Sequence, residues 1–106
     1  MPLESEFQSK IIKEIKRQYP GVVVLKNDPN YLLGVPDWLF LFENKWAMLE
    51  TKRYSNSVHQ NNQDYYIELF SRMSFASFVN PSNKEQVLDE LQITFRPNRP
   101  TRFPRR

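Results

Sequence analysis

The sequence predicts an α/β protein with a mixed sheet of four strands. Apolar residues recur with the period of a helix near the N-terminus, three strand-like runs follow, and then a second helix and a fourth strand. This order of helix, strand, strand, strand, helix and strand is that of one α/β unit. A chain of 106 residues is large enough for one core and fits a single domain.

The first helix is expected over residues 3–19. Its apolar residues fall within one arc at about 100° per residue, and they are Phe7, Ile11, Ile12, Ile15 and Tyr19. The basic residues on its other side are Lys10, Lys13, Lys16 and Arg17. Glu4 lies in the middle of the apolar arc, with Gln8 beside it. Glu4 either remains solvated at the positive end of the helix dipole or faces inward toward a metal or substrate group.

Three strands should follow the stop at Pro20-Gly21. The first is the β-branched run 22–26, and a loop rich in turn-forming residues leads from it to Gly34. The run 39–42 is uniformly apolar, so we expect a central strand covered on both faces. A short corner at Asn44-Lys45 should fold the next strand back on it.

The strand 46–52 alternates in character. Because successive side chains point to opposite faces of a sheet, Trp46, Met48, Glu50 and Lys52 share one face. The other face receives Ala47, Leu49 and Thr51. A Glu-x-Lys spacing on a strand can therefore bring both charged groups into one site.

The remaining elements are predicted from capping patterns and composition. Ser57 and Gln60 resemble a capping box that opens a helix running to about Met73, with Gln63 near its protein-facing side. Residues 75–79 should form the fourth strand. A second capping box, Ser82 with Glu85, should open a short helix through about Leu91.

The C-terminal residues differ from the rest of the chain. From Ile93 onward prolines alternate with arginines, which indicates an extended arm. Residues 96–106 contain five arginines and no acid, whereas the other 95 residues carry ten basic and twelve acidic side chains. We therefore expect one domain over 1–95 and a basic arm that contacts the phosphates of DNA. The arm's candidate DNA-binding residues are Arg96, Arg99, Arg102, Arg105 and Arg106.

Composition excludes several classes of site. The chain has no cysteine, so disulfides and thiolate zinc sites are excluded. No apolar run approaches the ~20 residues that cross a bilayer, and we expect neither a signal peptide nor a membrane partner.

Two carboxylates and an ammonium should meet where the hairpin of the second and third strands ends. Asp37 opens the second strand and Glu50 closes the third, so antiparallel pairing brings them together. Oxygen ligands without cysteine or clustered histidine select Mg²⁺ or Mn²⁺, and the Thr51 backbone carbonyl could add a further oxygen. Lys52 could orient a water molecule and neutralise charge on a phosphate. Alternatively, Asp37 only caps a turn and Glu50 with Lys52 is an exposed cross-strand pair.

The residues Gly34-Val35-Pro36-Asp37, followed after twelve residues by Glu50-Thr51-Lys52, resemble the PD-(D/E)XK nuclease superfamily. Gln63 at a helix start is similar to the VRR-NUC branch and to small phage nucleases. Glu4, Phe7 and Gln8 match the spacing of a first-helix acid that often completes the site in such proteins. Over residues 4–90 the resemblance implies a restriction-endonuclease-like core, with the arm left uncovered.

The resemblance implies an endonuclease that leaves a 5′-phosphate and a 3′-hydroxyl. Asp37 and Glu50 would bind Mg²⁺ or Mn²⁺, with Glu4, Lys52 and Gln63 completing the catalytic set. Gln60 could hold the role of Gln63.

Small relatives of this branch resemble junction-resolving dimers, which implies a homodimer that acts on branched or Holliday-junction DNA. The implied location is the cytoplasm of a bacterium or of a phage-infected host cell. The alternatives are a sequence-specific homing or restriction-type endonuclease, a non-catalytic DNA-binding module on a nuclease fold, and a protein-interaction domain.

His59, the only histidine, and four aromatic residues complete the candidates. We expect His59 to be a bystander and Trp38, Trp46, Tyr65 and Tyr66 to serve mainly in packing rather than in stacking on bases.

Overall fold

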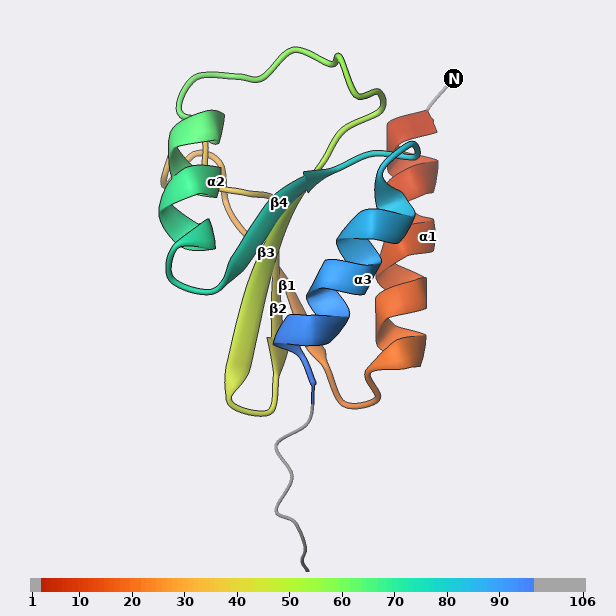
Figure 1. The fold of residues 1–106 in the computed structure, drawn as a ribbon. Coiled ribbons are helices and arrows are strands. Elements are labelled where there is room, and N and C mark those ends of the chain that lie inside the picture. The colour runs from red at the N-terminus through yellow and green to blue at the C-terminus, as the bar shows by residue number, and fades with distance from the viewer. Residues whose placement is uncertain (1–2, 97–106) are drawn as a thin grey trace, which may run out of the picture.

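The fold is a small α/β arrangement of one open sheet and three helices. A computed structural model of the chain describes residues 3–96 (Figure 1). The elements are α1 (Leu3–Gln18), β1 (Val23–Lys26), β2 (Trp38–Phe42), β3 (Lys45–Thr51), α2 (Gln63–Ser71), β4 (Phe75–Val79) and α3 (Lys84–Thr94). The strands lie in the order β1-β2-β3-β4, antiparallel except for the parallel pair β3–β4. The predicted α/β class and mixed four-stranded sheet are confirmed.

The two faces of the sheet carry different helices. α1 and α3 pack side by side on one face, and α2 covers the other face near β3 and β4 (Figure 1). The main core lies on the α1 and α3 side, where the expected stripe of α1 is buried. Its residues are Phe7, Ile11, Ile15, Tyr19, Phe40, Ala47, Leu49, Val79, Val87, Leu88, Leu91 and Phe95.

The alternation predicted for β3 is confirmed. Ala47 and Leu49 are fully buried in the main core. Trp46, on the opposite face, meets Phe70 of α2 edge-on at 6.2 Å between ring centroids. The face that holds Glu50 is therefore the face covered by α2.

The hairpin turn lies one residue earlier than predicted. Phe42 and Lys45 still pair in the sheet, so the turn is Glu43-Asn44 and not Asn44-Lys45. Glu43 adopts φ 57°, in the left-handed region that a two-residue hairpin requires of at least one central residue. Glu43 also accepts an ion pair from Lys45 at 3.1 Å across the turn.

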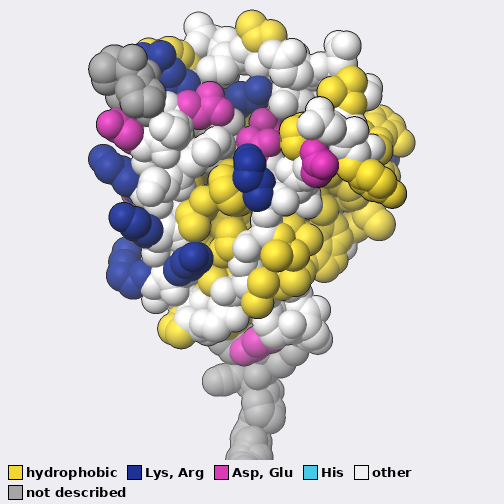
Figure 2. Space-filling view, turned by 180° about the vertical axis from the view of Figure 1, so that it is seen from behind, with side chains coloured by type: hydrophobic (Ala, Val, Ile, Leu, Met, Phe, Trp, Pro, Cys, Tyr) yellow, Lys and Arg dark blue, Asp and Glu magenta, His cyan; other side chains and the backbone are white. Residues whose placement is uncertain are grey.

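The coverage of β2 was predicted wrongly. It is an interior strand, but Leu39 and Leu41 are only half-buried because α2 packs mainly on β4. On the adjoining edge strand β1, Val23 and Leu25 are exposed. Hydrophobic side chains gather on this side of the molecule in Figure 2.

Neither predicted capping box forms. The helix expected from Ser57 begins only at Gln63, after the N-cap residue Asn62. At α3, the Ser82 hydroxyl donates to Asn80 at 2.6 Å, and the helix begins at Lys84 after Asn83.

The C-terminal helix is also longer than predicted. It continues past Leu91 to Thr94. Phe95 is completely buried, with its ring 5.2 Å from Tyr19 and 5.6 Å from Phe42, and this packing holds the last turn against the core. The arm predicted from residue 93 onward therefore cannot begin before Phe95.

No helix within residues 3–96 is long and apolar enough to cross a membrane.

Candidate active site

The carboxylates of the candidate site come from the two ends of the β2–β3 hairpin. Trp38 pairs with Leu49, so Asp37 lies opposite Glu50 where the two strands end. The backbone N–H of Asp37 donates to Oε1 of Glu50 at 3.0 Å. The structure thus brings Asp37 and Glu50 together as the hairpin predicts.

A buried polar chain joins Glu50 to Lys52 through Gln63 of α2. The Gln63 amide donates to Oε2 of Glu50 at 3.1 Å, and its Oε1 accepts from the Lys52 ammonium at 2.8 Å. The exposed fractions of Glu50, Lys52 and Gln63 are 4%, 8% and 9%. Because Glu50 of β3 and Lys52, one residue beyond its end, present their side chains to the same face, a single side chain from the covering helix contacts both.

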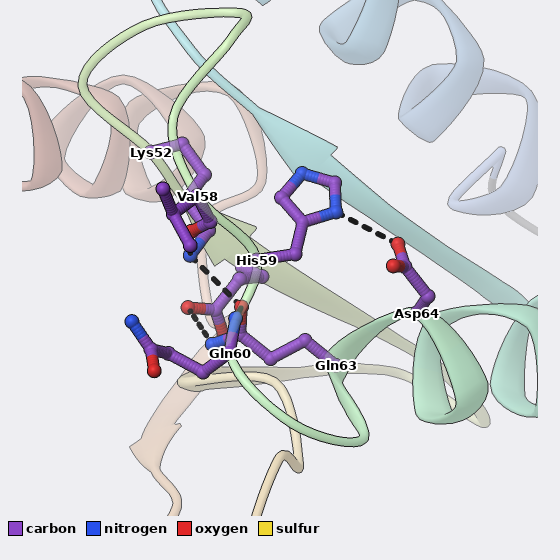
Figure 3. A network of polar contacts seen from close by, with 7 residues as sticks. Lys52, Val58, His59, Gln60, Gln63 and Asp64 are labelled. Atoms are coloured by element: carbon purple, nitrogen blue, oxygen red, sulfur yellow. Dashed lines mark hydrogen bonds and ion pairs between the residues drawn. The ribbon is translucent and has the colours of Figure 1, made fainter.

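The backbone of the loop before α2 completes this set of polar contacts. The Val58 carbonyl accepts a second hydrogen bond from the Lys52 ammonium at 3.0 Å, and the Gln60 N–H donates to Oε1 of Gln63 at 2.8 Å (Figure 3). In the predicted capping box, the Gln60 N–H would donate to the Ser57 hydroxyl. In the structure it donates to Gln63 instead. The structure also decides between the two glutamines: Gln63 contacts the site with its side chain, whereas Gln60 is exposed and contributes its backbone.

The carboxyl group of Glu50 has an unusual affinity for protons. Burial, and next the negative charge of Asp37, raise its pKa from 4.5 to about 7. The Asp37 N–H and the Lys52 ammonium act in the opposite direction, and Glu4 raises the pKa further. Two further carboxylates and one ammonium thus act on Glu50, so the cluster carries more negative than positive charge.

Glu4 is near the site but not bonded into it. Its side chain is exposed at the start of α1, and its charge acts on Glu50 through space. The next turn of α1 reaches the same region through Gln8, whose amide donates to the buried hydroxyl of Thr51 at 2.7 Å. The side chain that points inward from this part of α1 is therefore that of Gln8 and not that of Glu4.

His59 lies closer to the site than the sequence indicated. Its ring stacks on Phe78 with 4.0 Å between the ring centroids. Its Nδ1 lies 2.8 Å from Oδ1 of Asp64, as Figure 3 shows. Phe78 pairs with Glu50 in the β3–β4 register. The imidazole is therefore next to the carboxylate cluster, one strand away. In the sequence, the only indication that His59 lies near the site is its position just before the second helix.

The residues present fit a hard divalent cation. Within residues 3–96, no three His, Asp or Glu side chains gather closely enough to hold a metal by themselves. Asp37 and Glu50 supply two carboxylates in a cluster with more negative than positive charge, and the Thr51 carbonyl follows Glu50 directly. These are oxygen donors of the kind that bind Mg²⁺ or Mn²⁺, and Mg²⁺ commonly keeps several waters.

The chain matches no known protein in the three comparisons made. Family models, curated proteins and solved structures all gave no match. The candidate site therefore rests on its own geometry and chemistry.

The arginine arm contributes one described residue. Arg96 is exposed just after α3. The other four arginines predicted to bind DNA, Arg99, Arg102, Arg105 and Arg106, lie outside the described residues.

Proposed function

We propose that the chain is a divalent-metal-dependent endonuclease that hydrolyses phosphodiester bonds in DNA. The observation that carries the proposal is the buried chain Glu50–Gln63–Lys52 beside Asp37. A surface ion pair would need no such burial, and an acid whose pKa is raised to about 7 by burial and by a neighbouring carboxylate is typical of a functional site. The element order and the mixed sheet support a restriction-endonuclease-like core for the same reason: they bring these residues to one end of a hairpin.

The metal in this proposal is Mg²⁺ or Mn²⁺, held by Asp37, Glu50 and the Thr51 carbonyl. When bound, such a cation acts as a Lewis acid on phosphate oxygen and lowers the pKa of water. The Asp37 N–H and the Gln63 amide each occupy one oxygen of Glu50, which fixes the orientation of its carboxylate.

Lys52 supplies the positive charge of the reaction. Two of the three N–H donors of its ammonium go to Gln63 and Val58, which leaves one for a water molecule or a phosphate oxygen. An ammonium held in place by two acceptors can stabilise the negative charge that develops on the phosphate without reorganising.

The proposed substrate is branched or junction DNA. A core of this size leaves little room for a separate base-reading module, which argues for selection by DNA shape rather than by sequence. One site cuts one strand, so paired cuts would require a homodimer.

The test is cleavage of four-way-junction, nicked and linear DNA by the full chain, with Mg²⁺ or with EDTA. We expect Mg²⁺-dependent cleavage that Asp37→Asn reduces at least about 100-fold, the scale at which loss of one catalytic group lowers rates. Asp89→Asn, which neutralises an exposed carboxylate on α3, is the matched control and should cleave normally. Absence of metal-dependent cleavage on all three substrates would refute the enzyme. Cuts confined to one linear sequence would replace junction selectivity with the restriction-type alternative.

A further inference from the structure

The exposed side of α1 carries a row of unpaired cations. Lys10, Lys13 and Lys16 are exposed and spaced three residues apart, about 4.5 Å along the helix axis. None of them forms an ion pair with another residue of the described chain. Lys and Arg side chains line this edge of the molecule in Figure 2. The row thus presents a positive charge that the protein itself leaves uncompensated.

Glu14, the acid nearest the middle of the row, already forms ion pairs with other residues. Glu14 accepts an ion pair from Lys84 of α3 at 3.2 Å, and Arg17 approaches its other oxygen at 3.9 Å. Its carboxylate is therefore partly neutralised from the far side of α1. This arrangement removes the main local competitor for the lysines.

A groove runs beside the row. It has a volume of about 370 Å³, and Lys13 and Lys16 line one wall while Trp38 lines the other. Lys26, the cross-strand neighbour of Trp38, lies 4.7 Å from the indole centroid and adds another cation. The indole Nε1 of Trp38 is buried without a hydrogen-bond partner in the described chain. A groove with cationic rims and an unpaired N–H donor is suited to an anionic ligand.

The groove adjoins the end of the hairpin that carries the carboxylates. Gln8 lines the groove and donates to Thr51, which follows Glu50 as the last residue of β3 and directs its side chain to the α1 face of the sheet. Trp38, on the opposite wall, directly follows Asp37. An extended ligand in the groove would thus pass next to the end of the hairpin.

We propose that this groove and the lysine row bind the sugar-phosphate backbone of the nucleic-acid strand that enters the site. The proposal rests on the proposed function, because it concerns the substrate of that site. A polymer with one negative charge per residue matches a row of separate cations better than a compact anion does. The residues of this surface come from α1 and from strands β1 and β2.

The test compares two double variants of the full chain that remove the same charge. Lys13→Gln/Lys16→Gln alters the groove, whereas Lys45→Gln/Arg72→Gln removes two cations elsewhere. Fluorescence anisotropy in EDTA, between 50 and 200 mM salt, measures binding to a labelled duplex and to a single strand of the same length. Each lost phosphate contact lowers the slope of log affinity against log salt by about 0.9 on duplex and about 0.7 on single strands.

The groove variant should lose about 2 from the duplex slope, or about 1.4 if a single strand is the ligand. The substrate that shows the loss identifies the source of the phosphates. Lys13→Arg/Lys16→Arg should retain wild-type affinity. Equal losses in the two Gln variants would overturn the proposal, because they would reflect net charge alone. Equally tight binding of polyglutamate with the same number of charges would overturn it in favour of an acidic protein partner.

The indole gives an independent readout. The chain has two tryptophans, so Trp46→Phe leaves Trp38 as the sole reporter in the groove. DNA should change its fluorescence in EDTA, and no change at saturation would contradict a strand in the groove.

Failure of this inference is distinguishable from failure of the nuclease proposal. Loss of salt slope without any metal-dependent cleavage would support the surface and refute the enzyme. Asp37-dependent cleavage with unaltered slopes would support the enzyme and refute the surface.

Discussion

Glu50 is the residue in which burial, charge and hydrogen bonding meet. Its carboxylate is 4% exposed, lies beside Asp37 and contacts Gln63, and its pKa is raised to about 7. An acid in such a position is destabilising when it is ionised and no metal ion is bound. A bound metal ion favours the ionised form, so the protonation of Glu50 should change when metal binds.

The free energy of unfolding should therefore fall with pH in EDTA. An unfolded chain releases the Glu50 proton near pH 4.5, whereas the folded chain retains it to about pH 7. Between these values the folded state binds more protons, so stability decreases as pH rises. The loss from pH 5 to 8 should reach about 2–3 kcal/mol, since one pKa unit corresponds to 1.36 kcal/mol. Urea unfolding at several pH values measures it.

Glu50→Gln is the control for this prediction. The amide cannot titrate, so the variant should lack the component of the pH dependence that wild type shows. Mg²⁺ should also reduce the wild-type loss, because it stabilises the folded, ionised form. Identical pH profiles for wild type and Glu50→Gln would contradict the origin assigned to the effect.

At the scale of elements, the site depends on how the loop before β2 meets the start of α2. Gly34 has φ 92°, and a Cβ at this position would lie 2.6 Å from both the Asn61 carbonyl oxygen and Cβ of Asn62. Gln63 follows directly as the first residue of α2. The Gly34 backbone therefore approaches the start of α2 too closely to leave room for a side chain, directly before the glutamine that contacts Glu50.

Gly34→Ala and Gly21→Ala form a matched pair. Both glycines have positive φ, 92° and 93°, so each alanine should cost about 1–2 kcal/mol of backbone strain. Only Gly34 adds a steric clash, because nothing lies within 4 Å of a Cβ at Gly21. We expect urea unfolding to show a loss for Gly34→Ala that exceeds the loss for Gly21→Ala by at least about 1 kcal/mol. Equal losses would mean that the loop moves away from α2 without cost.

At the scale of the whole molecule, the described chain holds one carboxylate cluster. If the protein makes paired cuts at a junction, two copies must act together. Sedimentation at micromolar concentration should then show a dimer. When wild type is mixed with an excess of Asp37→Asn chains, the remaining active sites should nick DNA instead of making paired cuts. A monomer at all concentrations would contradict the homodimer.

The parts of the fold that were predictable depend on local periodicity. The burial of Ile11 and Ile15 follows from the helical arc of α1, and the shared face of Glu50 and Lys52 follows from alternation in β3. The misplaced start of α2 has the opposite cause. The N–H of Gln60 donates to the Gln63 side chain, which is fixed by Glu50 and Lys52, and the Val58 carbonyl accepts from Lys52, so the predicted capping box is replaced by contacts with the site.

Local patterns in the sequence were sufficient to predict the α/β class, the hairpin and the pairing of Asp37 with Glu50, because strand alternation and antiparallel pairing fix the register within one hairpin. Packing between elements established that Gln63 rather than Gln60 joins Glu50 to Lys52. It also established that Gln8 rather than Glu4 bonds at Thr51, and that His59 stacks beside the cluster. Each of these contacts joins separate elements rather than two strands of one hairpin, so local sequence preference does not set its geometry.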